Sequence, residues 1–127
     1  MNSKQIKIPG PEHSIDITPT KGRVMVTVNG IRIADTREAL TLKEAAYPPV
    51  QYIPRKDVDM TRLQRTEHET YCPYKGDCAY YSIRADGECS VNAVWTYEAP
   101  YAAVSAIREY LAFYPDRVDA IEVGIED

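Results

Sequence analysis

Residues 24–33 read Val-Met-Val-Thr-Val-Asn-Gly-Ile-Arg-Ile, and this stretch decides the fold class. Branched apolar residues recur at every second position, which is typical of a half-buried β-strand. Asn29-Gly30 is a strong hairpin signal, because a type I′ turn requires positive φ at both of its central positions. The turn predicts two residue pairs on one apolar face of a hairpin: Val28 with Ile31, and Val26 with Ile33.

A second hairpin is predicted around Asp86-Gly87, with strands from Cys78 to Arg84 and from Glu88 to Glu98. A two-residue turn there pairs Cys78 with Trp95, Tyr80 with Ala93 and Ser82 with Val91. Side chains alternate between the two faces of a strand. One face is therefore expected to carry Tyr80, Trp95 and Tyr97, and the other Tyr81, Ile83, Asn92 and Val94.

The remaining segments are predicted to be short strands and short helices. Strands are expected at Ile15–Ile17, at Leu40–Leu42 within 39–46, and at Ala120–Ile125, with Leu111–Tyr114 open between helix and strand. A helix of about two turns is expected after an N-cap at Asp57 or Asp59, and another over Tyr101–Ile107. The fold class predicted is mainly β, one antiparallel system with short helices, in a single domain over residues 1–127.

Composition narrows the classes of protein that the chain can represent. It has 127 residues, 44% of them hydrophobic and 27% charged, and a net charge of -4, as in ordinary globular proteins. The chain has no run of basic residues, so no nucleic-acid partner is expected. It also has no apolar run close to the roughly 20 residues that span a membrane, so no membrane partner is expected. The first residues lack a signal-peptide core, so a cytoplasmic protein is expected. The sequence is compatible with a homodimer.

Three cysteines, Cys72, Cys78 and Cys89, are present, and none forms a CxxC pair. An odd number of cysteines without paired spacing favours reduced thiols over a disulfide framework, and no metal is expected. Cys72 with His68 is a candidate nucleophile and base, and Lys75 is a cation close enough in sequence to activate the thiol.

Two short motifs match nucleotide-binding signatures incompletely. Asp57-Val58-Asp59 has the form of a metal-binding acid pair, but the Gly-Ser signature of nucleotidyltransferases is missing upstream, and helix capping explains both carboxylates. Lys75-Gly76 lacks the rest of a phosphate loop. The sequence therefore favours neither a triphosphate site nor a Walker-type site.

Aromatic residues are the unusual part of the composition, because eight of the ten tyrosines lie between Tyr71 and Tyr114. Trp95 is the only tryptophan, and Tyr97 follows it at strand spacing. Arg55, Lys75 and Arg84 are candidates to meet a small anion beside these rings, since a guanidinium or ammonium group near a stacking plane is a frequent arrangement in ligand pockets.

Four segments occur in an order and spacing that resemble one family: Tyr47–Arg55, Thr70–Gly76, Val94–Tyr101 and Leu111–Val118. On these segments, over roughly residues 20–125, the chain resembles the bacterial and fungal family catalogued as domain of unknown function 427, sometimes labelled nucleotidyltransferase-like. The resemblance implies a β-tent fold, in which two antiparallel sheets meet at an angle. The thalidomide-binding domain of cereblon-like proteins and methionine sulfoxide reductase B share this fold.

Several proteins with that fold hold zinc through paired CxxC motifs, which are missing here, so the resemblance implies no metal for this chain. It does imply a groove between the two sheets. The residues that match an aromatic lining of that groove are Tyr80, Trp95 and Tyr97.

The function expected is a β-tent domain, without a cofactor, that binds a small anionic or cyclic amide-like ligand. Its aromatic and cationic groove is expected to contain Arg55, Lys75, Tyr80, Trp95 and Tyr97. Two alternatives stay open. One is an enzyme for a small metabolite, using Cys72 with Lys75 or Lys75 with Glu98, and the other is a partner-binding protein.

Overall fold

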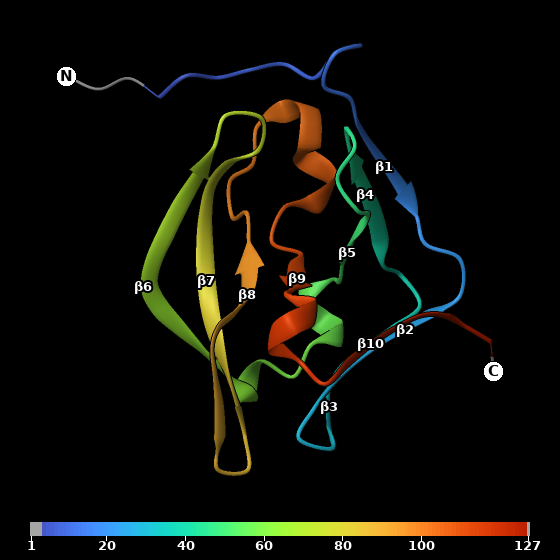
Figure 1. Ribbon diagram of the computed structural model, residues 1–127, viewed down its shortest axis with the longest axis vertical. Coiled ribbons are helices and arrows are strands. Elements are labelled where there is room, and N and C mark those ends of the chain that lie inside the picture. The colour runs from blue at the N-terminus through green and yellow to red at the C-terminus, as the bar shows by residue number, and fades with distance from the viewer. Residues whose placement is uncertain (1–3, 127) are drawn as a thin grey trace.

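The computed structural model describes residues 4–126, which form ten strands and four 3₁₀ segments (Figure 1). The strands are β1 Ile15–Pro19, β2 Arg23–Val28, β3 Ile31–Thr36, β4 Leu40–Glu44, β5 Val50–Tyr52, β6 Leu63–Cys72, β7 Gly76–Ala85, β8 Glu88–Thr96, β9 Leu111–Phe113 and β10 Ala120–Ile125. The 3₁₀ segments are Arg55–Asp57, Met60–Arg62, Ala102–Ile107 and Pro115–Arg117. The mainly β class with short helices is confirmed. No helix within residues 4–126 is long and apolar enough to cross a membrane.

The strands pair in three antiparallel sheets, in the orders β1-β4-β5, β10-β2-β3 and β6-β7-β8-β9. In Figure 1 the β6–β9 sheet and the β1-β4-β5 sheet stand on opposite sides of the molecule, and the β10-β2-β3 sheet lies across its lower right. The chain leaves one sheet at Pro19 and enters another at Arg23, after a turn in which Gly22 has a φ of 81°. This break divides the strands into three sheets where two were expected.

Both predicted hairpin turns are confirmed, because Asn29, Gly30, Asp86 and Gly87 all have positive φ. The first register shifts by one residue beyond the turn. Val28 pairs with Ile31 as predicted, but Val26 lies opposite Ala34 instead of Ile33. The hairpin keeps its apolar face in spite of this bulge, because Ile33 and Ala34 are both buried with the valines of β2.

The second register shifts by two residues between Tyr81 and Ile83, so the predicted partners of Cys78 and Tyr80 are wrong, whereas Ser82 lies at the shift itself. Near the turn Ile83 pairs with Ser90 as predicted, but farther away Tyr80 pairs with Trp95. Asn92, with a φ of 49°, lies in the extra segment of β8. A shift of two preserves the face of every side chain. Tyr80, Trp95 and Tyr97 therefore share one face as predicted, and pack into one cluster.

The helix predicted after Asp57 or Asp59 is wrong beyond its first turn. Asp59 is indeed an N-cap, and its carboxylate accepts a hydrogen bond from the Thr61 backbone N–H at 3.2 Å, but only Met60–Arg62 is helical. The chain then becomes β6, because residues from Leu63 onward pair with β7. Sheet pairing here outweighs the local capping signal.

The β6–β9 sheet has a buried cluster on each face. One cluster packs Tyr81, Ile83, Val94 and Phe113 against the β10-β2-β3 sheet, and includes Val24, Val26, Val28 and Ile33. The other packs Cys78, Tyr80, Tyr97 and Ala112 against Leu42 and Tyr52 of the β1-β4-β5 sheet. The two clusters come close together around the short edge strand β9.

Candidate functional site

A cavity of about 480 Å³ lies where the edge strands of the three sheets approach one another. β5 and β10 are edge strands of their sheets, and β9 is an edge strand of the third. We call this cavity the junction pocket. Its lining residues are Val26, Pro49, Val50, Gln51, Ile53, Trp95, Phe113, Pro115, Asp119, Ala120, Ile121 and Val123.

Proline positions explain why the sheets leave space here. Pro48, Pro49 and Pro54 limit β5 to three residues, and Pro115 lies two residues after the end of β9. Proline removes a backbone donor and interrupts strand pairing. β5 and β9 therefore meet through one bridge, between Ile53 and Leu111, and the space beside that bridge is lined by side chains from several segments.

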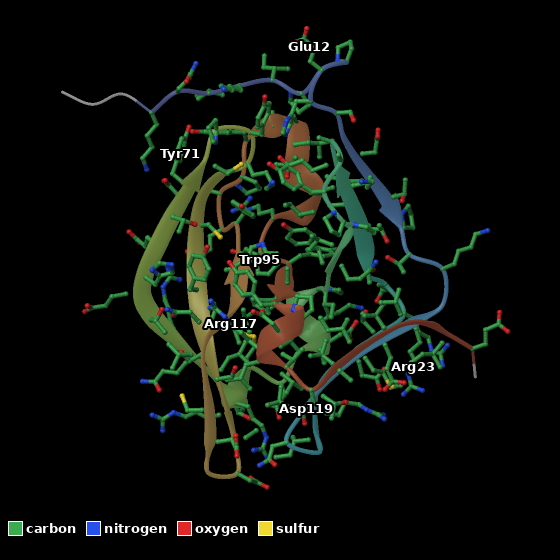
Figure 2. The ribbon with its side chains drawn as sticks, viewed as in Figure 1. Glu12, Arg23, Tyr71, Trp95, Arg117 and Asp119 are labelled. Atoms are coloured by element: carbon green, nitrogen blue, oxygen red, sulfur yellow. The ribbon has the colours of Figure 1, made fainter. Side chains whose placement is uncertain are left out.

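Trp95, near the centre of the view in Figure 2, forms part of the pocket wall, and two tyrosines contact its ring. Its Nε1–H donates to the Tyr52 Oη at 3.1 Å, and its ring centroid lies 4.5 Å from that of Tyr114. Tyr52 is 2% exposed, and burial raises the pKa of its hydroxyl above the ordinary value, so it remains a neutral hydrogen-bonding group. The indole is half-buried. Trp95 is thus fixed in orientation and still adjoins the cavity.

The lining of the junction pocket is mainly apolar and contains no Lys, Arg or His among residues 4–126. Its one charged residue is Asp119, whose carboxylate accepts from the Asn29 backbone N–H at 2.7 Å. The Gln51 side chain is engaged by Thr20 at 2.6 Å and by Thr41 at 3.0 Å. The pocket therefore offers apolar contact and one negative charge, and it lacks a group that would neutralise an anion.

Of the five residues expected in an aromatic and cationic groove, Trp95 lines the junction pocket. Tyr80 and Tyr97 lie on the same sheet face but are buried within the cluster that packs on the β1-β4-β5 sheet. The Tyr80 hydroxyl lies 2.8 Å from Thr70 Oγ1 and 3.5 Å from the Tyr114 hydroxyl. Burial raises the pKa of both Tyr80 and Tyr97. These two rings support the wall behind Trp95.

Lys75 is buried away from the junction pocket, in an ion pair with Glu44. His13 Nε2 lies 2.7 Å from the other Glu44 oxygen, and its ring stacks on Tyr74. Burial raises the pKa of the Glu44 carboxyl, but the hydrogen bonds from Lys75 and His13 outweigh this effect, and the net pKa is lowered. The Lys75 ammonium thus has an internal counter-ion.

Arg55 lies on the opposite face of the β6–β9 sheet from Lys75. Its Nη1 donates to the Tyr81 hydroxyl at 3.3 Å, whereas the Lys75 Nζ lies over the ring of Tyr97. Tyr81 and Tyr97 belong to the two different clusters. Arg84 is exposed on β7. The structure therefore does not bring the three predicted cations together.

The candidate catalytic pairs are also separated or engaged elsewhere. Cys72 and His68 lie four residues apart on β6, where the strand rise places their backbones roughly 13 Å apart. Glu98 pairs with Arg65, with one contact of 2.9 Å, while Lys75 pairs with Glu44. Cys78 is buried, which raises the pKa of its thiol, and Cys89 is exposed.

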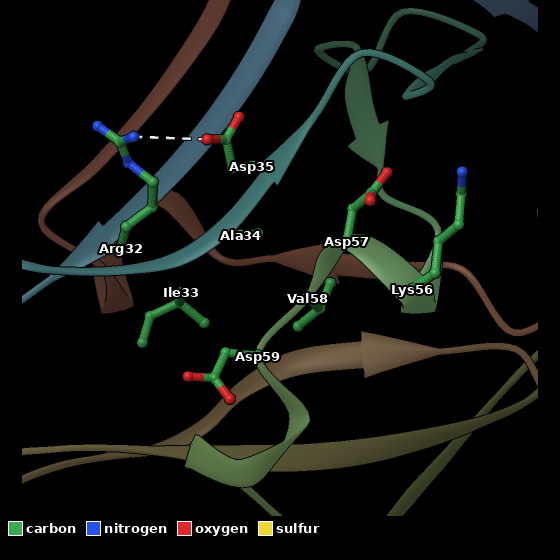
Figure 3. A pocket seen from close by; sticks show the side chains of 8 residues that line it. All are labelled: Arg32, Ile33, Ala34, Asp35, Lys56, Asp57, Val58 and Asp59. Atoms are coloured by element: carbon green, nitrogen blue, oxygen red, sulfur yellow. Dashed lines mark hydrogen bonds and ion pairs between the residues drawn. The ribbon is translucent and has the colours of Figure 1, made fainter.

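Asp57 and Asp59 line a shallow surface pocket of about 400 Å³ (Figure 3). Their carboxylates point in different directions (Figure 3). Asp57 accepts from Thr36 Oγ1 at 2.7 Å, and Asp59 caps the Met60–Arg62 turn. Within residues 4–126 no group of three or more His, Cys, Asp and Glu side chains is arranged to hold a metal ion. The two aspartates have local structural roles.

The sequence profile of one family, described as a domain of unknown function (DUF427), matches residues 16–124. The match covers most of the chain, and the chain belongs to this family. No curated protein matches it. Every residue that lines the junction pocket lies within the matched region.

Apart from Trp95, the residues of the junction pocket were missed by sequence reasoning. They come from seven separate stretches of chain, and side chains such as Ile53, Phe113 and Ile121 look like ordinary core residues. The prolines were the sequence feature that could have indicated the pocket. Pro49 precedes one edge strand, Pro115 follows another, and both line the cavity.

Proposed function

We propose that the protein is a binding module for a small, uncharged, mostly apolar molecule that occupies the junction pocket. The observation that carries this proposal is the cavity of about 480 Å³ beside the only tryptophan, with an apolar lining. Ligand pockets have volumes of roughly 300–1,000 Å³ and are lined mainly by apolar and aromatic groups with a few polar ones.

The charge of the pocket lining is negative, which favours an uncharged ligand over the anionic ligand that the sequence predicts. Asp119 is the charged residue of the lining, and the candidate cations Lys75 and Arg55 have other partners, Glu44 and Tyr81 respectively. An anion here would meet a like charge and no counter-ion, which disfavours its binding.

A neutral fluorescent probe, 1-N-phenylnaphthylamine, tests the proposal. We expect its emission to rise on binding and that of Trp95 to change in parallel. Ile121→Trp should abolish binding because it fills the pocket from β10. Ile125→Trp is the matched control, since Ile125 lies on the same strand outside the lining, and it should bind the probe as the wild type does.

The charge of the ligand is tested with 8-anilinonaphthalene-1-sulfonate, an anionic relative of the same probe. It should bind about tenfold more weakly than the neutral probe, and Asp119→Asn should narrow that difference. Equal binding of the neutral probe to the wild type and to Ile121→Trp would show that the junction pocket is not the site.

A further inference from the structure

Two bulges distort the β6–β9 sheet on either side of strand β7. The pairing with β6 shifts opposite Tyr80, where β6 has residues 66–68 against one residue of β7. The pairing with β8 shifts opposite Ser82, where β8 has residues 91–93 against one. Tyr80 and Ser82 are two residues apart and therefore point to the same face of β7. Bulges redirect side chains and are frequent beside binding sites.

Asn92 connects the two bulges across β7. Its backbone has a φ of 49°, a conformation that is uncommon outside glycine and that asparagine tolerates. Its N–H donates to Ser82 Oγ at 3.0 Å, and its Oδ1 accepts from Thr66 Oγ1, in the β6 bulge, at 2.6 Å. These bonds fix the side-chain amide in place. The Nδ2 group of that amide has no partner among residues 4–126.

Arg117, in the 3₁₀ segment that follows β9, is fixed beside Asn92. Its Nη1 donates to the backbone carbonyls of Asn92 at 2.8 Å and Val91 at 3.4 Å. Its guanidinium carbon lies 4.7 Å from the centroid of the Tyr114 ring. In the described part of the chain its Nε and Nη2 groups have no partner. The guanidinium is therefore held by one nitrogen and keeps one edge free.

The free edge of Arg117 is the edge that binds a carboxylate side-on. Arg23 uses this edge within the chain, since its Nε and Nη2 donate to the two oxygens of Asp35 at 2.6 and 2.5 Å. Such paired, charge-assisted bonds suit carboxylates and phosphates. Glu88 and Asp116 line a surface pocket with Arg117, but neither forms an ion pair with it. Arg117 thus offers a bidentate site that no acid within residues 4–126 fills.

Contacts join the residues around this edge in a closed ring on one face of the sheet. The hydroxyl of Tyr114 lies 3.5 Å from that of Tyr80, and the ring centroid of His68 lies 4.4 Å from that of Tyr80. The backbone N–H of His68 donates to Thr66 Oγ1 at 3.3 Å and so closes the ring. We call these six residues the bulge site: Thr66, His68, Tyr80, Asn92, Tyr114 and Arg117. The site has nitrogen donors and no acidic side chain, which favours an anion.

We propose that the bulge site binds a small organic anion, whose carboxylate or phosphate oxygens pair with Nε and Nη2 of Arg117 and with Nδ2 of Asn92. The imidazole of His68 is the third nitrogen donor of the ring. None of the six residues lines the junction pocket, so the bulge site is a second site and is independent of the proposed function.

Three probes of similar shape test the proposal by NMR of the ¹⁵N-labelled protein: benzoate, phenyl phosphate and neutral benzamide. The better of the two anions should bind about tenfold more tightly than benzamide and move the Nε–H proton signal of Arg117 downfield. Which anion binds better identifies the bound group as a carboxylate or a phosphate. The Nε–H of Arg23, already bonded to Asp35, is the internal control. The amides of Val26 and Ile121 report separately on the junction pocket.

Two substitutions separate recognition from folding. Asn92→Asp keeps the oxygen that accepts from Thr66 and tolerates the positive φ, but it replaces the Nδ2 donor with a negative oxygen and should abolish anion binding. Arg117→Gln should weaken anion binding about tenfold. Arg84→Gln is the matched control, because it removes an exposed arginine from β7 of the same sheet, and it should bind as the wild type does.

The proposal is overturned if neither anion moves the Arg117 Nε–H signal. Equal losses in Arg117→Gln and Arg84→Gln would also overturn it, since the anions would then respond to overall charge alone. Wild-type affinity in Asn92→Asp would do the same. Loss of binding in Asn92→Asp and Arg117→Gln, with Arg84→Gln unaffected, supports the bulge site whatever the junction pocket binds.

Discussion

Glu44 is held by two partners, Lys75 and His13, and it connects β4 to the loop that precedes β7. Its carboxylate meets Lys75 on one oxygen and His13 on the other, and Lys75 is 8% exposed. Breaking a buried ion pair on one side leaves the other charge without compensation, which costs more than replacing both members together. Stability at this site therefore depends on the pair as a unit.

Glu44→Gln should lower the free energy of unfolding by about 2 kcal/mol at pH 7, measured by urea denaturation with Trp95 fluorescence as the signal. The folded pKa of Glu44 lies below its ordinary value of 4.5, so the ionised carboxylate stabilises the fold above that value. As the pH falls through the lowered pKa, the difference between wild type and variant should shrink.

The double variant Glu44→Gln/Lys75→Met provides the control for that prediction. It should recover roughly half of the loss caused by Glu44→Gln alone, because it removes the stranded ammonium group. Strictly additive effects of the two substitutions would contradict a coupled buried pair.

At the scale of elements, the contact between the turn before β2 and the end of β10 depends on two glycines. A Cβ built on Gly22 would lie 2.9 Å from the carbonyl carbon of Gly124, whereas one on Gly30 would meet nothing within 4 Å. Both residues have positive φ, so the backbone strain of a substitution is similar at the two positions.

Gly30→Ala should therefore cost about 1 kcal/mol of unfolding free energy, from the positive φ alone. Gly22→Ala should cost about 3 kcal/mol, because its methyl group also pushes β10 away from the turn. Thermal or urea unfolding of the two variants measures the difference. Equal losses would mean that β10 does not need the close approach at Gly22.

The elements show what local sequence can and cannot predict. Asn29-Gly30 and Asp86-Gly87 determined both hairpins, because turn chemistry acts over two residues. The bulges that shift both registers had no such signal. The capping residue Asp59 is present, yet the segment after Met60–Arg62 is a strand, because pairing with β7 is a tertiary effect.

At the scale of the whole molecule, the site depends on how the three sheets meet. Trp95 could be predicted as a wall residue because it is the only tryptophan and lies on the aromatic face of a hairpin. The rest could not, since the partner of Lys75 lies 31 residues away in sequence and the pocket collects side chains from β2, β5, β8, β9 and β10. Binding at this junction should also tie the sheets together and raise the melting temperature.

The most direct test of the account is a crystal structure of the protein purified from its own cells, with the extracted small molecules identified by mass spectrometry. We predict electron density for an uncharged, mostly apolar molecule in the junction pocket, against Trp95. A pocket closed by its own side chains, or a ligand held at Lys75, would contradict the account.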